Sequence, residues 1–178
     1  NACEVYRRYR HDVIMFGCTS GSLIGGPGFD RELITRMEAI TGDPCLTTST
    51  AVLEAFQALG VSRPVVITPD TNEAEKVFLE NNGLQVRFIS GMGNDYVNQS
   101  ITDIEPHYVF QKVKPLPRDG ADSLFISCTG LNVLDIIELL ETDLNMPVVT
   151  SNQASLWACL RHSRVNDKLP GLGRLFTI

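Results

Sequence analysis

The sequence lacks the cysteine and histidine patterns that bind structural metals. Its five cysteines are odd in number and widely spaced, and no Cys-x-x-Cys motif occurs. The three histidines share no spacing with one another or with a nearby pair of acidic residues. Neither a zinc site nor a disulfide framework is therefore indicated, and we expect no metal. Unpaired cysteines favour a reducing compartment, so we expect a cytoplasmic protein.

Large basic clusters and long apolar runs are also missing. The chain carries 15 Lys and Arg residues against 21 Asp and Glu residues, a formal net charge of −6. This balance argues against nucleic acid as a partner. No apolar run approaches the roughly 20 residues that span a bilayer, and the first residues lack the charged-then-apolar pattern of a signal peptide. We therefore expect no membrane partner.

Three familiar catalytic or binding motifs are absent as well. The glycine-rich stretch 21–28 contains neither the Gly-Lys-Ser/Thr of a phosphate-binding loop nor the glycine spacing of a dinucleotide fingerprint. No Gly-x-Ser-x-Gly elbow of a serine hydrolase occurs. Nucleotide-dependent and serine-hydrolase chemistry are therefore not indicated.

One pattern does occur, and it occurs twice. The segments Val13–Ser22 and Ser123–Gly130 each combine a short apolar run with a Cys-Thr pair and a small residue. An apolar run this short predicts a buried strand rather than a helix, with a hydrogen-bonding loop after it. The pattern places Cys18 and Cys128 at the ends of two strands, which suggests one site between two similar halves.

The rest of the chain alternates strands with helices of about ten residues. We expect strands at 13–17, 45–48, 65–68, 86–89 and 147–150, with a further strand ending at Cys128. We expect helices at 1–10, 51–59, 74–81, 104–113 and 152–161, one that Asp30 caps and Gly42 ends, and one from Leu131 to Leu140. This alternation predicts an α/β fold with parallel sheets flanked by helices, in which sites lie at the carboxyl ends of the strands. We expect two lobes, residues 1–61 plus 150–178 and residues 62–149, with the active site between them.

These residues resemble the Asp/Glu racemase superfamily, and within it the branch of maleate isomerases and arylmalonate decarboxylases. The similarity lies in Gly17–Ser20, in Ser127–Leu131, in the closing Pro147–Trp157 with its Ser-Asn-Gln helix start, and in Gly171–Leu175. The resemblance implies two pseudosymmetric lobes, each contributing a cysteine to a site that needs no cofactor. It also implies an N-terminal βα segment with a substrate-binding Asn, which we expect to be missing here.

The resemblance implies three related chemistries. Racemases of the superfamily remove a proton with one cysteine and return it with the other on the opposite face. Maleate isomerases add a thiolate to a double bond, let the bond rotate and then eliminate. Arylmalonate decarboxylases keep only the cysteine that matches Cys128 and have Gly at the position of Cys18. The presence of both cysteines therefore favours an isomerase or racemase that acts on a small carboxylic acid.

The same resemblance assigns roles to individual residues. Cys18 is the expected nucleophile, and Cys128 is its partner acid or base; the remaining cysteines, Cys3, Cys45 and Cys159, are expected to be small buried residues. The expected substrate-binding groups are Thr19, Ser20, Thr129 and Gly130 beside the thiols, and Asn98 in the loop after the strand at 86–89.

Asp70 departs from the pattern of the branch, where a Tyr that donates to the substrate carboxylate follows the Thr-Pro pair. An ionised Asp cannot donate and repels a carboxylate, so a substrate with an amide, an amine or a single carboxylate becomes more plausible. In the alternative interpretation, Asp70 and Glu73 form a capping box at a helix start.

Two other functions stay open at this stage. One is a decarboxylase of malonate-type acids that protonates an enediolate from Cys128. The other is a homologue that has lost catalysis and only binds a ligand. The resemblance also leaves a homodimer open, since helix faces in this superfamily often form dimers.

Overall fold

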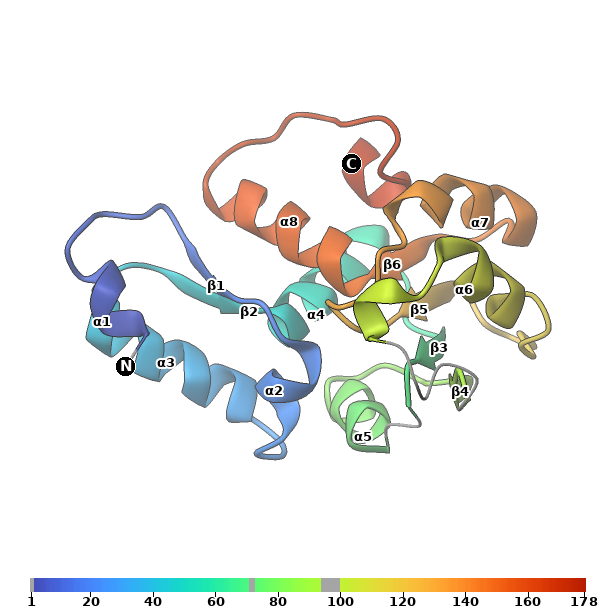
Figure 1. Cartoon of the computed structure of the whole chain (residues 1–178), viewed down its shortest axis with the longest axis horizontal. Coiled ribbons are helices and arrows are strands. Elements are labelled where there is room, and N and C mark those ends of the chain that lie inside the picture. Colours follow the sequence, from blue (N-terminus) through green and yellow to red (C-terminus); the bar gives the residue numbers. More distant parts are fainter. Residues whose placement is uncertain (1, 71–72, 94–99) are drawn as a thin grey trace.

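The protein is an α/β molecule with two parallel sheets, seen in a computed structural model that describes residues 2–70, 73–93 and 100–178 (Figure 1). The strands are β1 Ile14–Phe16, β2 Cys45–Thr47, β3 Pro64–Thr68, β4 Phe88–Gly91, β5 Ser123–Ile126 and β6 Val148–Thr150. The α-helices are α1 Cys3–Tyr6, α2 Thr19–Leu23, α3 Phe29–Thr41, α4 Thr48–Leu59, α5 Glu73–Asn81, α6 Pro106–Val113, α7 Ile137–Leu144 and α8 Ser151–His162. Three short 3₁₀ turns complete the described elements: η1 Ile101–Asp103, η2 Leu134–Ile136 and η3 Arg174–Thr177. The predicted fold class is confirmed.

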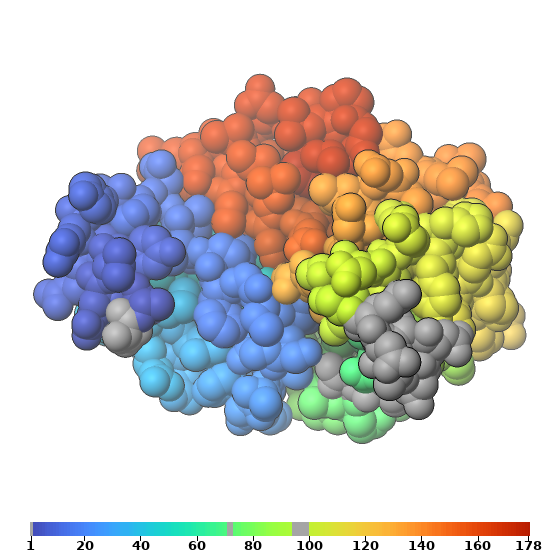
Figure 2. All heavy atoms as spheres, viewed as in Figure 1, coloured from blue at the N-terminus to red at the C-terminus, as the bar shows by residue number. Residues whose placement is uncertain are grey.

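The two sheets differ in size but share the parallel arrangement. In the small sheet β1 pairs with β2, from Ile14 beside Cys45 to Phe16 beside Thr47. The larger sheet has the order β4-β3-β5-β6, and every pair in it is parallel. All residues of β3, β5 and β6 are buried, as expected for central parallel strands covered on both faces. In Figure 2 the blue N-terminal part and the yellow and orange later part form two sides of one face.

The core lies on the two faces of the larger sheet. On one face, Val66, Phe125 and Val149 pack with residues of α4 and α8, and the rings of Phe56 and Phe125 meet edge to face at 5.7 Å. On the other face, the alternate strand residues pack against α6 and α7. Helix α8 packs on α4 between the sheets, and both helices begin directly after a strand. The carboxyl ends of β2 and β6 therefore continue directly into α4 and α8, the two helices that pack together between the sheets.

Several elements differ locally from those expected. The expected N-terminal helix 1–10 is limited to α1, and the fourth strand is displaced toward Gly91, where its residues pair with β3. Helix α3 starts after Gly28, which adopts a left-handed conformation with φ of 83°, so Asp30 does not cap it. Asp30 is instead buried in the first turn and accepts a hydrogen bond from Thr50 Oγ1 at 3.2 Å.

The region between Cys128 and β6 also differs from the expected regular helix. It opens with turns and η2, and α7 begins only at Ile137. Strand β6 belongs to the larger sheet, while α8 after it packs on α4. None of the described helices is long and apolar enough to cross a membrane.

Candidate active site

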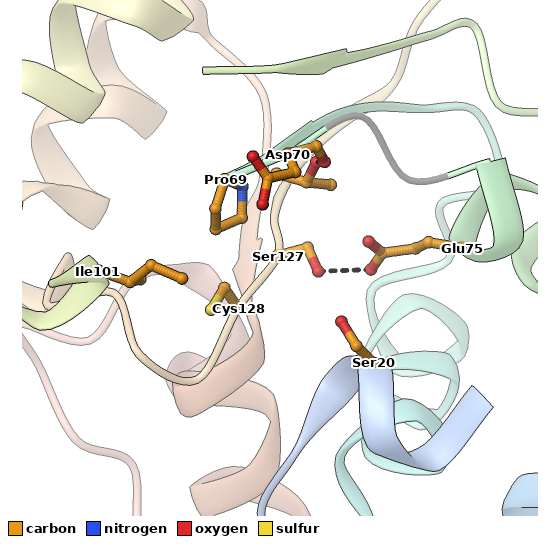
Figure 3. A pocket seen from close by; sticks show the side chains of 8 residues that line it. Ser20, Pro69, Asp70, Glu75, Ile101, Ser127 and Cys128 are labelled. Atoms are coloured by element: carbon orange, nitrogen blue, oxygen red, sulfur yellow. Dashed lines mark hydrogen bonds between the residues drawn. The ribbon is translucent and has the colours of Figure 1, made fainter. Parts of the chain in front are cut away.

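A cavity of about 200 Å³ opens at the carboxyl ends of β3 and β5 (Figure 3). Helix α2 contributes to it from the side of the small sheet. The residues that line it are Ser20, Thr68, Pro69, Asp70, Glu75, Ile101, Ser127 and Cys128. This is the edge of a parallel sheet at which ligands bind, and the lining is mostly polar.

Cys128 follows β5 with an unusual backbone conformation. Its φ of 129° is one that residues with a side chain rarely adopt, and such strain is concentrated at functional sites. The N–H of Gly130 donates to the Cys128 sulfur at 3.3 Å. Burial raises the pKa of the thiol, although the N–H groups of Gly130 and Leu131 oppose this effect. Cys128 is therefore a protonated thiol at neutral pH, suited to giving a proton.

The start of α8 holds the Cys128 loop in place. Ser151 Oγ accepts a hydrogen bond from the N–H of Cys128 at 3.0 Å. Asn152 Nδ2 donates to the carbonyl oxygens of Thr129 and Leu131, each at 3.1 Å. Gln153 forms a capping box with the residue before the helix, which fixes the helix start itself. The Ser-Asn-Gln sequence at the start of α8 therefore holds the Cys128 loop in position.

Cys18 occupies the N-cap of α2 and is exposed. Its sulfur accepts a hydrogen bond from the N–H of Gly21 at 3.3 Å. A Cβ on Gly21 would lie 3.0 Å from this sulfur and 3.2 Å from the Phe16 ring, so glycine provides the room for the contact. Cys18 is not among the residues that line the cavity, but its charge contributes to raising the pKa of the Cys128 thiol. The two thiols therefore interact electrostatically at neighbouring loop starts.

The two threonines of the Cys-Thr pairs connect these loops to the scaffold. Thr19 is buried, and its hydroxyl donates to Ser151 Oγ at 2.9 Å. Thr129 Oγ1 donates to the carbonyl oxygen of Gly17 at 3.2 Å. Ser151 thus contacts the segments of both cysteines. Of the groups expected to bind substrate near the thiols, Ser20 lines the cavity and Gly130 contacts the Cys128 sulfur. The two threonine hydroxyls are instead hydrogen-bonded within the protein, Thr19 to Ser151 and Thr129 to Gly17.

Asp70 lines the cavity, and its backbone carbonyl accepts a hydrogen bond from the Thr68 hydroxyl. Helix α5 begins at Glu73, but residues 71 and 72 lie outside the described part of the chain, as does the expected substrate-binding Asn98. The capping-box interpretation of Asp70 therefore stays a prediction.

Glu75 is a cavity residue that the sequence analysis did not identify. Its side chain is 2% exposed and accepts a hydrogen bond from Ser127 Oγ at 2.5 Å. Burial raises the pKa of the carboxyl to about 7, and the Ser127 hydrogen bond opposes this rise. The available signal was helical spacing, because Glu75 shares the inward face of α5 with Phe78 and Leu79. Within residues 2–70, 73–93 and 100–178, no three His, Cys, Asp or Glu side chains are grouped as metal ligands.

Comparison with known proteins identifies the family. The family model described as arylmalonate decarboxylase matches residues 2–176. The chain is 34% identical over 171 residues to an arylmalonate decarboxylase of Bordetella bronchiseptica, covering 92% of this chain and 70% of the relative. It is 27% identical over 173 residues to a maleate isomerase of Nocardia farcinica, covering 92% of this chain and 68% of the relative.

Solved structures agree with this assignment. The maleate isomerase of Pseudomonas putida S16 superposes with a TM-score of 0.89 at 21% identity, over 98% of this chain and 74% of that one. Unliganded arylmalonate decarboxylase gives a TM-score of 0.84 at 29% identity, over 98% of this chain and 78% of that one. The resemblance found in the sequence is confirmed. The relatives of this chain named above are enzymes, an arylmalonate decarboxylase and maleate isomerases. The chain belongs to the arylmalonate decarboxylase family.

Proposed function

We propose that the protein is a cofactor-independent isomerase or racemase that acts on a small carboxylic acid with two cysteines. The observation that carries the proposal is the pair of unlike thiols on two loops that both contact Ser151. Cys18 is exposed and receives an N–H at its sulfur, whereas Cys128 is half-buried with a raised pKa. An accessible thiol beside an N–H suits attack or proton removal, and a thiol that keeps its proton suits the acid.

The proposed steps move one proton at a time. In the isomerase version, the Cys18 thiolate forms a C–S bond to one alkene carbon while Cys128 gives its proton to the other. Rotation about the new single bond is followed by loss of the same proton to Cys128 and expulsion of Cys18 as thiolate. In the racemase version, the Cys18 thiolate takes the α-proton and the Cys128 thiol returns one on the opposite face. Support comes from a cysteine-to-serine variant of the Nocardia farcinica isomerase, described with a covalently bound succinylcysteine intermediate.

The second candidate is a decarboxylase of malonate-type acids. Two observations favour it: the relative at 34% identity is an arylmalonate decarboxylase, and Cys18 is not among the cavity-lining residues. In this chemistry the substrate's C–C bond to one carboxylate breaks, CO2 leaves, and Cys128 protonates the resulting enediolate. Cys18 then has no essential role.

The deciding experiment follows candidate acids in D2O by proton NMR. Maleate reports isomerisation, a single enantiomer of a 2-substituted acid reports racemisation through deuterium uptake, and phenylmalonate reports decarboxylation. Cys128→Ala should abolish every activity. Cys18→Ala should abolish isomerisation and racemisation but leave decarboxylation intact. Cys159→Ala is the matched control, since this half-buried cysteine also has a raised pKa but lies along α8 away from the cavity.

Each outcome separates the candidates. Loss of isomerisation or racemisation in both cysteine variants supports the two-thiol proposal. Decarboxylation that survives in Cys18→Ala favours the second candidate. Acid binding without turnover points to a ligand-binding homologue and contradicts both enzyme proposals. We also infer a reducing compartment, because all five cysteines are free thiols and oxidation would remove the reactive pair.

A further inference from the structure

A second cavity of about 330 Å³ is formed by helices α3 and α4, the segment that joins α4 to β3, and the residues that follow α5. The residues that line it are Arg31, Leu53, Phe56, Gln57, Val61, Asn82 and Leu84. None of them belongs to the described lining of the cavity beside Cys128. Binding sites for small molecules have volumes of about 300–1,000 Å³ and combine apolar side chains with a few polar groups. The second cavity has this size and this composition.

The apolar part of the lining is continuous with the core. Phe56 is 1% exposed, and its ring meets that of Phe125 edge to face. Leu53, Val61 and Leu84 are partly buried and pack against the same core cluster. Each of these three side chains keeps some apolar surface in contact with solvent. A ligand with an apolar chain would remove this surface from water, which favours binding.

Three exposed polar side chains complete the lining. Arg31 lies on α3, Gln57 on the last turn of α4, and Asn82 directly after α5. Asn82 Nδ2 donates to the carbonyl oxygen of Phe78 at 2.8 Å, which holds this amide in place. The described lining contains one charged group, the Arg31 guanidinium, and no carboxylate. An anionic group of a ligand would therefore meet a cation without a competing acid in this lining.

The carboxylates adjacent in sequence to the lining residues have partners elsewhere. These partners are Thr50 for Asp30 at 3.2 Å, Arg36 for Glu32 at 3.7 Å, and His162 for Glu54 at 3.1 Å. Among the residues that the structure describes, none forms an ion pair with Arg31. The N–H donors of a guanidinium match the two oxygens of a carboxylate, so Arg31 is suited to bind one.

We propose that this cavity is a second ligand site, which binds a small organic acid with one carboxylate and an apolar chain. Arg31 binds the carboxylate, and the amides of Gln57 and Asn82 offer further hydrogen-bonding groups in the same lining. The chain of the acid lies against the apolar residues. Binding is non-covalent and involves neither of the two reactive cysteines, so the proposal goes beyond the proposed function and does not depend on it.

The lining also predicts which ligands bind poorly. A second carboxylate would have to leave water beside apolar side chains, which costs free energy. An acid without a chain gains nothing from the apolar residues, and an alcohol of the same length gains nothing from Arg31. We therefore expect hexanoate to bind more tightly than adipate, acetate or 1-hexanol, with a Kd of about 1 mM or below.

The test titrates the whole protein with hexanoate and follows its backbone amides by heteronuclear NMR. We expect shifts at residues 31, 53–61 and 82–84, and affinities for the three comparison ligands that are lower by about tenfold or more. Arg31→Gln should weaken hexanoate binding by about tenfold or more, because a neutral amide cannot form the charge-assisted pair. Leu84→Gln should weaken the binding of hexanoate but not that of acetate, because it makes the apolar part of the lining polar.

Arg36→Gln is the matched control. It removes the same charge from the same helix, and the exposed pair of Arg36 with Glu32 contributes little to stability, so the affinity for hexanoate should be unchanged. Thermal melts of all variants exclude a folding defect as the cause of lost binding.

The position of the shifts separates the two cavities, because hexanoate is itself a small acid. Shifts at 53–61 and 82–84 that disappear in Arg31→Gln support the proposal, whether or not residues 18–20 and 127–131 also respond. Shifts confined to the cavity beside Cys128, unchanged affinity in Arg31→Gln, or equal affinity for hexanoate and 1-hexanol would each overturn it. Failure of every acid to turn over would contradict the proposed function and leave this result unaffected.

Discussion

Replacing Ser151 with Ala should damage both the stability and the site of the protein. The Ser151 side chain is buried, and its oxygen accepts hydrogen bonds from the Cys128 N–H at 3.0 Å and from Thr19 Oγ1 at 2.9 Å. A buried donor left without a partner costs about 1–3 kcal/mol. The Thr19 hydroxyl can rotate toward another acceptor, whereas the amide of Cys128 is fixed. We therefore expect a loss of about 2 kcal/mol in the free energy of unfolding, or about 4–8 °C in Tm for a chain of this size.

The assay combines urea unfolding with iodoacetamide labelling followed by peptide mass mapping. Labelling of Cys128 should become faster, because its amide no longer holds the strained loop in place. Ser155→Ala is the matched control on the same helix, where a half-buried hydroxyl donates a single hydrogen bond to Thr48 Oγ1 at 3.1 Å. If Ser151→Ala is no less stable than Ser155→Ala, and Cys128 labels at the wild-type rate, the reasoning about Ser151 is refuted.

Three further predictions concern close packing and charge. Gly21→Ala should slow alkylation of Cys18 about two- to tenfold, because the new Cβ would lie 3.0 Å from the sulfur and displace the sulfur from the Gly21 N–H. A Cβ at Gly17 would meet nothing within 4 Å, so Gly17→Ala should leave the alkylation rate unchanged. Equal effects of the two substitutions would contradict the prediction. Gly173→Ala should lower the free energy of unfolding by about 1–3 kcal/mol more than Gly171→Ala does. Both glycines have positive φ, but only a Cβ at position 173 would lie 2.5 Å from Ile137 Cγ2. Equal losses would show that the structure relaxes to relieve this contact. The folded-state pKa of Glu75 is raised from 4.5 to about 7, so the folded state binds the proton more tightly, and the free energy of unfolding should fall by about 3 kcal/mol as pH rises through this window. This pH dependence should vanish in Glu75→Gln, and equal free energies of unfolding for the wild-type protein in urea at pH 5 and pH 7.5 would exclude it.

The strands were predictable from the sequence because each is a short apolar run bounded by residues typical of turns and loops. The strands of the larger sheet are buried on both faces, so their sequences are almost continuously apolar, and the Cys-Thr pairs mark where two strands end. The order of strands and helices, and hence the edge that carries the cavity, follows from that alternation.

The local errors have a common physical cause. Whether Asp30 caps a helix or accepts a hydrogen bond from Thr50 depends on a neighbouring helix that local sequence does not specify. The same holds for Thr19, whose hydroxyl meets Ser151 at a separation of 132 residues. Glu75 was missed because a Glu on a helix is ordinarily exposed, although its helical spacing with Phe78 and Leu79 placed it on the inward face of α5.

The position of Ser151 also has a consequence for the order in which the molecule is assembled during synthesis. The Cys18 segment is synthesised before the Cys128 loop, but the link between them is made by Ser151 at the start of α8, which is synthesised later still. Contacts that span so much chain are slow to form, and α8 must dock before they exist. A nascent chain that ends before α8 therefore holds two cysteine loops but no connection through Ser151, and this connection can form only after α8 has been synthesised.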